Sequence, residues 1–169
     1  MQDAILQATQ DDHYAAFAAL VREYVDWARR RDADQAWFVD AAYAHPSLDD
    51  ELAALARRYA PPHGVTLLAR RGAEVVACGA YRLHRPGVAE MKRVFVSPRG
   101  QRAGTGRALC VALLAAARAQ GCAWMRLDTG RRMVEAIAWY RSLGFAPCAP
   151  YHDDPPEFAP HLLFMERAL

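Results

Sequence analysis

The sequence predicts a single α/β domain over residues 1–169, with a mixed, mostly antiparallel sheet, two central parallel strands and flanking helices. The first observation is size, because 169 residues with a formal net charge of +2 suit one domain and bury about 70% of the unfolded surface. The second is a run of three strand-like segments joined by tight turns, which predicts antiparallel pairing. The third is a later strand–helix–strand segment, which predicts a parallel pair because parallel neighbours need a crossover.

The N-terminal region is predicted to form a strand and a long helix. Residues 4–9 alternate weakly in polarity and predict a short strand. Asp11 or Asp12 is expected to cap a helix that runs to about Arg31. Apolar side chains at helical spacing define the face of this helix that is expected to point inward: Ala16, Leu20, Tyr24 and Trp27.

A second helix is predicted after an irregular segment at residues 32–46. Ser47 with Asp50 three positions later resembles a capping box, which opens a helix. The prolines and the glycine within residues 60–64 are expected to end it.

The sheet is predicted from β-branched and aromatic segments further along the chain. Three of them lie in succession, at residues 65–70, 74–84 and 88–97. A helix then runs to about Gln120, where Gly121 closes it. The remaining elements are expected as a strand at 123–128, a helix at 131–143 and two strands at 145–149 and 161–168.

Composition argues against several classes of protein. The near-neutral charge argues against a dedicated nucleic-acid binder, which is usually strongly basic. The longest apolar run, residues 108–117, is too short to span a membrane. The first residues lack the basic and apolar segments of a signal peptide. We therefore expect no nucleic-acid or membrane partner and a cytoplasmic location.

The cysteines and histidines give no sign of a disulfide framework or a metal centre. The six histidines lack the spacing of metal ligands, so no metal is expected. The four cysteines lie in apolar contexts without paired spacing, and reduced core thiols are predicted for all of them: Cys78, Cys110, Cys122 and Cys148.

A glycine-containing loop between a strand and a helix is the most informative segment of the chain. Pro98 ends the strand, and Gly104 and Gly106 precede a helical run. No acidic residue occurs between Glu90 and Asp128. A helix start without acidic side chains, with glycines that admit close backbone approach, suits a phosphate. The alternative interpretation is a tight turn into a helix without a ligand.

Two common phosphate-binding motifs do not match this loop. A P-loop needs Lys followed by Ser or Thr after its last glycine, whereas Arg107 and Ala108 follow Gly106. The dinucleotide fingerprint needs a third small residue, and Leu109 occupies that position.

The loop and its surroundings resemble the GNAT N-acetyltransferase superfamily. Its Q/R-x-x-G-x-G/A signature matches six consecutive residues: Gln101, Arg102, Ala103, Gly104, Thr105 and Gly106. Residues 92–98 and 126–129 resemble the fourth and fifth strands of that family, and residues 138–145 resemble the end of its fourth helix. The resemblance covers residues 65–168 most clearly.

The resemblance implies acetyl-CoA as cosubstrate, bound where two parallel strands splay apart. It implies transfer of the acetyl group to a primary amine of a small molecule or peptide, and a homodimer is common in the family. The pantetheine arm would pair with the backbone of Val94, Phe95 and Val96. The diphosphate would bind the loop and the side chain after it: Gln101, Arg102, Ala103, Gly104, Thr105, Gly106 and Arg107.

Two catalytic candidates follow from the resemblance. Glu90 lies near the position where one branch of the family places its base, although a water chain serves many members. Its alternative is a surface acid paired with Lys92 or Arg93. Tyr140 matches the general-acid tyrosine and shares a helical stripe with Ile137. Its alternative is a core tyrosine.

Three further positions carry weaker hypotheses. Met133 stands where the family often has Asn, which puts one polar pantetheine contact in doubt. Asp128, at the end of its strand, is expected to cap the following helix. His152 beside Asp153 is not expected to form a dyad, because adjacency in sequence is poor evidence for facing side chains.

The acceptor pocket is expected to recognise a small amine with apolar or aromatic character. The resemblance assigns it two groups of residues, aromatic and acidic: Trp37, Phe38, Tyr43, Tyr151, His152 and Phe158, with Asp40, Asp153, Asp154 and Glu157. A non-catalytic acyl-CoA-binding sensor and a general nucleotide-phosphate binder remain alternatives, because both would share the glycine loop.

Overall fold

The computed structural model describes residues 3–44, 47–101 and 104–169. These residues form a seven-stranded sheet in the order β1-β2-β3-β4-β5-β7-β6, antiparallel except for β4 and β5. The predicted α/β fold with one central parallel pair is therefore confirmed. The strands are β1 (Ala4–Gln7), β2 (Gly64–Arg71), β3 (Glu74–Arg85), β4 (Val88–Val96), β5 (Trp124–Gly130), β6 (Ala146–Pro147) and β7 (Leu162–Ala168).

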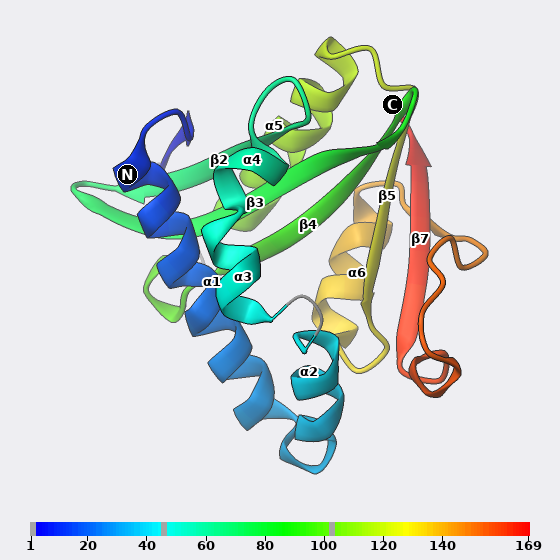
Figure 1. Cartoon of the computed structure of the whole chain (residues 1–169). Coiled ribbons are helices and arrows are strands. Elements are labelled where there is room, and N and C mark those ends of the chain that lie inside the picture. The colour runs from blue at the N-terminus through cyan, green and yellow to red at the C-terminus, as the bar shows by residue number, and fades with distance from the viewer. Residues whose placement is uncertain (1–2, 45–46, 102–103) are drawn as a thin grey trace.

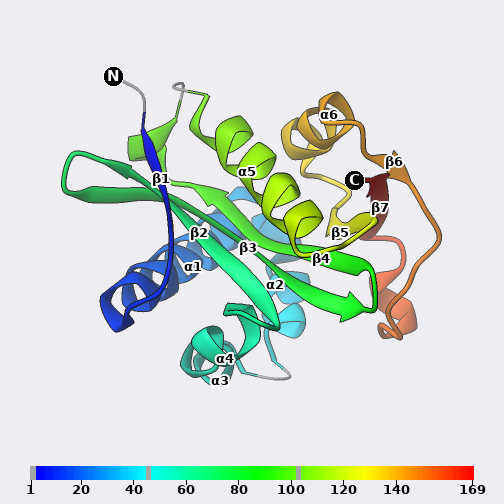
Figure 2. The same cartoon turned by 90° about the horizontal axis from the view of Figure 1, so that it is seen from above.

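Helices cover both faces of the sheet (Figure 2). One face carries α1 (Asp11–Arg31), α2 (Ala36–Ala42), α3 (Leu48–Ala53) and α4 (Leu55–Tyr59). The other face carries α5 (Thr105–Ala119) and α6 (Val134–Ser142). Each face has its own apolar core, with Phe17 fully buried in the first and Leu113 in the second. All four cysteines are free thiols; three lie in the core as expected, whereas Cys148 is only partly buried.

The long first helix confirms its prediction in extent but not in its cap or its inward face. Gln10 is the N-cap residue and contributes no side-chain hydrogen bond, so Asp11 and Asp12 lie in the first turn. The buried residues are Phe17, Leu20, Val21, Val25 and Ala28. Of the predicted face only Leu20 is buried, because the sheet contacts the helix mainly one position further along the chain.

The segment predicted to be irregular is mostly helical. Residues Ala33–Gln35 form a short 3₁₀ helix, and α2 follows directly. The prediction failed because α2 has only seven residues and no capping side chain, so the usual start signal is missing. The predicted cap at Ser47 is confirmed, because its hydroxyl accepts a hydrogen bond from the Asp50 N–H at 3.2 Å.

The pairing of β4 with β5 is short and positions the site. Only Val88, Ala89 and Glu90 have partners on β5. Beyond this end the two strands diverge (Figure 1), while β4 stays paired with β3 as far as Val96. The far half of β4 thus keeps one edge that no strand in the described residues covers.

Within the described ranges, every helix is too short or too polar to cross a bilayer.

Candidate active site

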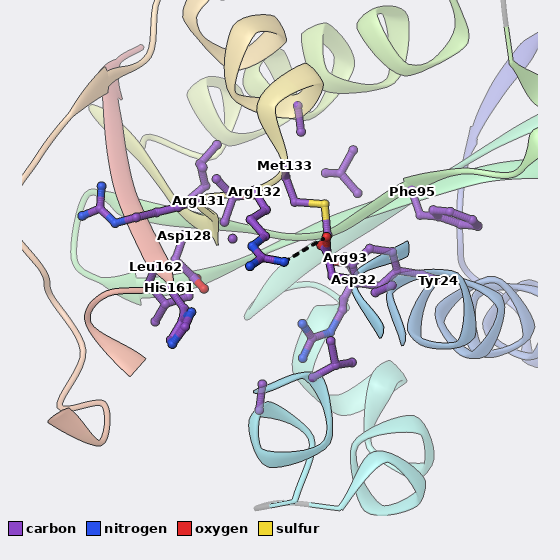
Figure 3. A pocket seen from close by; sticks show the side chains of 18 of the residues that line it. Tyr24, Asp32, Arg93, Phe95, Asp128, Arg131, Arg132, Met133, His161 and Leu162 are labelled. Carbon is purple, nitrogen blue, oxygen red and sulfur yellow. Dashed lines mark ion pairs between the residues drawn. The ribbon is translucent and has the colours of Figure 1, made fainter. Parts of the chain in front are cut away.

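A cavity of about 810 Å³ opens where β4 and β5 diverge (Figure 3). Its walls come from β4 and β5, from α1 and α2 on one side, and from α6 on the other. The loop between β6 and β7 contributes the remaining wall through His152, Asp154 and Phe158. The volume suits a medium-sized organic ligand.

A β-bulge on β4 shapes the floor of this cavity. The register with β3 jumps between Cys78/Phe95 and Ala80/Lys92, so Gly79 opposes two residues of β4. Arg93, one of those two, has φ of +58°, in the left-handed region that non-glycine residues rarely occupy. Bulges bend a strand and re-aim its side chains.

Buried contacts hold Arg93 in this strained conformation. Its guanidinium donates two hydrogen bonds of 2.7 Å to the Glu51 carboxylate, and it stacks over the Tyr43 ring at 4.8 Å. Glu51 belongs to α3 and is buried. A bidentate pair of this kind offsets a local backbone strain of about 1–3 kcal/mol. Arg93 therefore pairs with Glu51 rather than with Glu90.

The point where the strands part is bridged by Lys92. Its Nζ lies 2.5 Å from Asp128 Oδ1 on β5 and 3.1 Å from Glu90 Oε1 on β4. Burial lowers the pKa of Lys92, but Asp128 and Glu90 together raise it above the ordinary value. The ammonium thus remains charged and links the two diverging strands.

Glu90 lies behind the wall of the cavity and is fully buried. Its carboxylate accepts a hydrogen bond of 2.8 Å from Arg82 Nε and also contacts Lys92 and His152 Nε2. Burial raises the pKa of Glu90, but the hydrogen bond to His152 and the charges of Lys92 and Arg82 outweigh it and hold the pKa well below its ordinary range. Glu90 is not among the residues that line the cavity, whereas His152 is.

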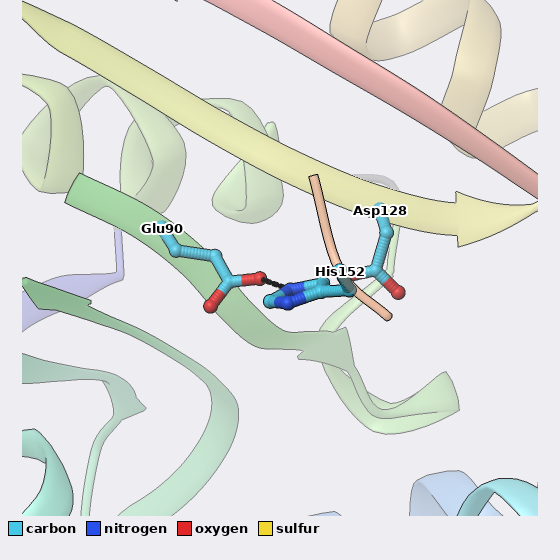
Figure 4. Close-up of side chains that lie close together, drawn as sticks. All are labelled: Glu90, Asp128 and His152. Carbon is cyan, nitrogen blue, oxygen red and sulfur yellow. Dashed lines mark hydrogen bonds and ion pairs between the residues drawn. The ribbon is translucent and has the colours of Figure 1, made fainter. Parts of the chain in front are cut away.

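Glu90, Asp128 and His152 place one potential ligand atom each within 4.8 Å of one another (Figure 4). Such a trio has donors that suit a divalent metal. Here the Lys92 ammonium already contacts both carboxylates. A metal would need to displace this cation, so the cluster fits an internal ion-pair network better.

Tyr140 reaches the cavity from α6 and is 8% exposed. Its ring stacks on Trp139 with centroids 5.7 Å apart and meets Phe145 edge-on at 5.8 Å. Burial raises the pKa of Tyr140 well above its ordinary value. The phenol therefore keeps its proton at neutral pH and is available as a donor.

The glycine loop leads into α5. Gly104 has φ of +70° at the N-cap, and no side chain caps the helix among the described residues. A Cβ on Gly106 would lie 2.6 Å from the Trp139 ring, so glycine is required for this helix to approach α6. Gln101 lines the main cavity with Val94, Phe95 and Val96. Arg102 and Ala103 lie outside the described residues.

Contacts with the N-terminal segment support the loop. Asp3 accepts hydrogen bonds of 2.7 and 2.8 Å from Arg71 and also contacts the Thr105 hydroxyl. Arg71 in turn donates to the Arg99 carbonyl at 2.8 Å. A second hollow of about 350 Å³ adjoins this network and is lined by Gly104, Thr105 and Arg107 among others. The Arg99 side chain pairs with Glu23 and Glu74 at 3.0 Å each.

Some of the residues predicted to bind the acceptor line the cavity. Phe38, Tyr43, His152, Asp154 and Phe158 line it, and the rings of Phe38 and Phe158 meet edge-on at 5.1 Å. The other predicted residues do not line it: Trp37, Asp40, Tyr151, Asp153 and Glu157. Two unpredicted side chains in the lining, Arg132 and Asp32, form an ion pair of 3.8 Å (Figure 3).

The family model of the acetyltransferase (GNAT) family matches residues 36–145, which is more than half of the chain. The chain belongs to the GNAT family. As a GNAT protein it is an acyl-CoA N-acyltransferase, and the family resemblance noted in the sequence is confirmed.

Two relatives are named as acetyltransferases. An uncharacterized N-acetyltransferase of Schizosaccharomyces pombe is 31% identical over 151 residues, which is 88% of this chain and 84% of the relative. An IAA acetyltransferase of Azospirillum brasilense is 40% identical over 107 residues, 61% of this chain and 67% of the relative.

Solved structures share the fold over the whole chain. A protein described as an acyl-CoA N-acyltransferase of Klebsiella pneumoniae has a TM-score of 0.74 at 28% identity, covering 99% of this chain and 97% of that one. The PaiA N-acetyltransferase of Thermoplasma acidophilum, solved in complex with coenzyme A, has a TM-score of 0.71 at 16% identity and full coverage of both chains.

Sequence reasoning misplaced Asp128 in this GNAT protein. The N-cap residue of α6 is Met133, without a side-chain cap, so the capping interpretation of Asp128 is wrong. It bonds Lys92 and lines the cavity instead. The partner of His152 was also missed, because Glu90 lies 62 positions away in sequence. A signal was present, since Glu90 is an isolated acid in the apolar run of residues 88–91 and such a buried charge needs partners.

Proposed function

We propose that this GNAT protein transfers the acetyl group of acetyl-CoA to a primary amine of a small molecule or peptide. The observation that carries the proposal is the cavity between the diverging strands β4 and β5. It joins an uncovered edge of β4 to Tyr140 on one wall and His152 on another. The names of the relatives and the coenzyme A in the Thermoplasma acidophilum structure support the same cosubstrate.

The cosubstrate would extend from the glycine loop into the cavity. Its pantetheine amides resemble a peptide and would add to the edge of β4 at Val94, Phe95 and Val96, as a strand adds to a sheet. The diphosphate would bind the amides at the start of α5, whose own first turn carries no acidic side chain. The Asp3 carboxylate reaches this turn from the N-terminal segment, but it is paired with Arg71. The proposed contacts are Gln101, Arg102, Ala103, Gly104, Thr105, Gly106 and Arg107.

Tyr140 would act on the leaving group. A coenzyme A thiolate forms when the thioester C–S bond breaks, and a neutral phenol nearby protonates it. The buried, protonated Tyr140 hydroxyl in the cavity wall supports this role.

Glu90 would support removal of the amine proton without touching the amine. An alkylamine arrives as an ammonium ion and cannot attack until it loses a proton. Glu90 supplies negative charge beside the cavity, but its side chain is fully buried behind the lining residues. The direct proton acceptor is then a water or a side chain between Glu90 and the cavity.

The acceptor is proposed to be an amine with an apolar or aromatic body. Phe38 and Phe158 offer apolar ring surface in the lining of the cavity. Asp128 is neutralised by Lys92, but Asp154 adds to the lining a carboxylate that pairs with no basic side chain among the described residues, which supports binding of a cationic amine. Asp154 is the only one of the predicted acids to line this cavity in the described structure.

Turnover tests the proposal directly. Purified protein is mixed with acetyl-CoA and a panel of primary alkylamines, arylalkylamines and peptides, and release of free thiol is followed. We expect acetyl-CoA-dependent thiol release with at least one amine and an acetylated product of matching mass. Binding of acetyl-CoA without turnover on any amine would contradict the proposal and favour a sensor.

A further inference from the structure

We propose that His152 takes the proton from the acceptor amine and that Glu90 is the positioning residue that orients it. This inference rests on the N-acetyltransferase function proposed above. It assigns a catalytic role to a side chain in the loop between β6 and β7, far in sequence from the glycine loop and from Tyr140.

The geometry places His152 between the substrate space and the buried carboxylate. Its side chain is 23% exposed and lines the cavity, whereas the side chain of Glu90 is 0% exposed. Figure 4 shows the imidazole between Glu90 and Asp128, with its Nε2 atom against the Glu90 carboxylate. A proton that leaves the cavity toward Glu90 therefore meets this ring first.

The contact with Glu90 selects the tautomer that catalysis needs. An ionised carboxylate can only accept a hydrogen bond, so Nε2 must carry the proton. The lone pair of the neutral ring is then on Nδ1, which has no hydrogen-bond partner among the described residues. A carboxylate also orients the histidine base of the catalytic triads, although there it contacts Nδ1 and leaves Nε2 as the base.

Three groups that lie near His152 or serve the other half of the reaction, Asp128, Lys92 and Tyr140, are less suited to this role. Asp128 is committed to Lys92 at 2.5 Å, and a carboxylate is in general a weaker proton acceptor than an imidazole. Lys92 is held as an ammonium by Asp128 and Glu90 and has no free lone pair. Tyr140 keeps its proton and is assigned to the leaving group.

Charged and titratable side chains from three strands surround His152. Glu90 and Lys92 come from β4, Arg82 and His84 from β3, and Asp128 from β5. The His84 ring lies 5.5 Å from the His152 ring, and the Tyr151 ring lies 4.7 Å from it. The Arg126 guanidinium lies over the Tyr151 ring at 5.1 Å. An imidazolium formed at His152 would find the negative charge of Glu90 next to it.

The proposed step conserves atoms and charge. His152 Nδ1 takes a proton from the ammonium form of the amine and becomes imidazolium, and the freed nitrogen lone pair bonds to the thioester carbonyl carbon. The C–S bond then breaks, and the thiolate takes the proton of Tyr140. The products are the acetamide and free coenzyme A. The second proton of the nitrogen returns to the Tyr140 phenolate through solvent, and the imidazolium releases its proton to solvent.

The pH dependence of His152→Gln on an alkylamine that the wild type acetylates tests the inference. At pH 7 we expect kcat/KM to fall about 100-fold or more, the usual contribution of a general base. Near pH 10 free ammonium ions lose their proton without help, so the loss should shrink to below about 10-fold. Glu90→Gln, which keeps the side-chain shape, should show a smaller loss of about 10-fold at pH 7 with the same trend.

Asp153→Asn is the matched control, because Asp153 is adjacent, exposed and outside the cavity lining, and its kcat/KM should equal that of the wild type. Acetyl-CoA affinity measured by calorimetry should be the same in all four proteins. A His152→Gln loss that is constant with pH, or no loss at all, would overturn the inference alone. A wild type that binds acetyl-CoA but acetylates no amine would overturn the proposed function and this inference together.

Discussion

At the scale of single residues, the site depends on polar side chains whose partners lie far away in sequence. Glu51 and Arg93 are 42 positions apart, and Glu90 and His152 are 62 apart. The family resemblance selected Glu90, but local spacing in the sequence could not identify its partner. Tyr140 was predicted to lie on an apolar face, and the structure places it in the cavity wall. Its catalytic role stays a prediction.

Tyr140→Phe tests that role with little change in packing. We expect kcat to fall about 100-fold, because the coenzyme A thiolate loses its proton donor. Acetyl-CoA affinity should change little, since the ring and its stack on Trp139 remain. Steady-state kinetics and calorimetry measure the two quantities.

Tyr14→Phe is the control. Tyr14 lies on α1, outside the cavity lining, and its hydroxyl donates a hydrogen bond of 3.3 Å to the Ala8 carbonyl. It should retain wild-type kcat. A Tyr140→Phe variant that is as active as this control would remove Tyr140 from the mechanism.

At the scale of elements, strong local signals were predicted well and short helices were not. The strands β2, β3 and β4 and the helix α5 lie close to their predicted bounds because β-branched runs, tight turns and a glycine start define them. The helix α2 was missed, since seven residues without a cap carry little local signal. It is held in place by tertiary contacts at the cavity wall instead.

The packing of α5 against α6 gives a prediction for Gly106→Ala. Alanine normally favours a helix over glycine by about 1 kcal/mol. Here the new Cβ would lie 2.6 Å from Cη2 of Trp139 and 3.0 Å from Val96, and overpacking costs about 1–3 kcal/mol. We expect a net loss of stability in urea denaturation. We also expect lower kcat, because Trp139 stacks on Tyr140.

Gly87→Ala is the control, because it introduces backbone strain at a positive φ without a steric clash. Gly87 has φ of +74°, but no atom lies within 4 Å of its added Cβ. The variant should lose about 1 kcal/mol of stability and keep wild-type kcat. Equal kcat in both variants would show that the contact between α5 and α6 does not position Tyr140.

At the scale of the whole molecule, the splayed sheet combines two cores and one cavity. The sequence predicted one domain and a central parallel pair, because the crossover helix α5 requires it. It did not predict that β4 and β5 would pair at only three positions. Pairing length depends on the bulge at Arg93 and on the cross-strand bridge from Lys92 to Asp128, which no local pattern reveals.

Buried acids that hold these elements together predict how stability depends on pH. Burial opposes ionisation of Glu90, but His152, Lys92 and Arg82 hold its pKa below the unfolded value of 4.5. Hydrogen bonds from Arg71 and Thr105 likewise lower the pKa of Asp3. A lowered pKa adds stability that is present above the unfolded pKa and is lost as pH falls toward the folded value.

We therefore expect the free energy of unfolding to fall as pH drops below about 4.5. In urea denaturation at a series of pH values, Glu90→Gln should be less stable than the wild type at pH 7 and should show a shallower decline under acid. A variant with the wild-type slope would mean that Glu90 does not contribute to acid sensitivity.

Every role proposed for these residues requires acetyl-CoA to bind between β4 and β5, and calorimetric titration of the wild type with acetyl-CoA measures that binding. We predict one-to-one binding that coenzyme A competes away and that an excess of ATP leaves in place. No heat of binding, or displacement of acetyl-CoA by ATP as effectively as by coenzyme A, would show that this cavity is not an acetyl-CoA site.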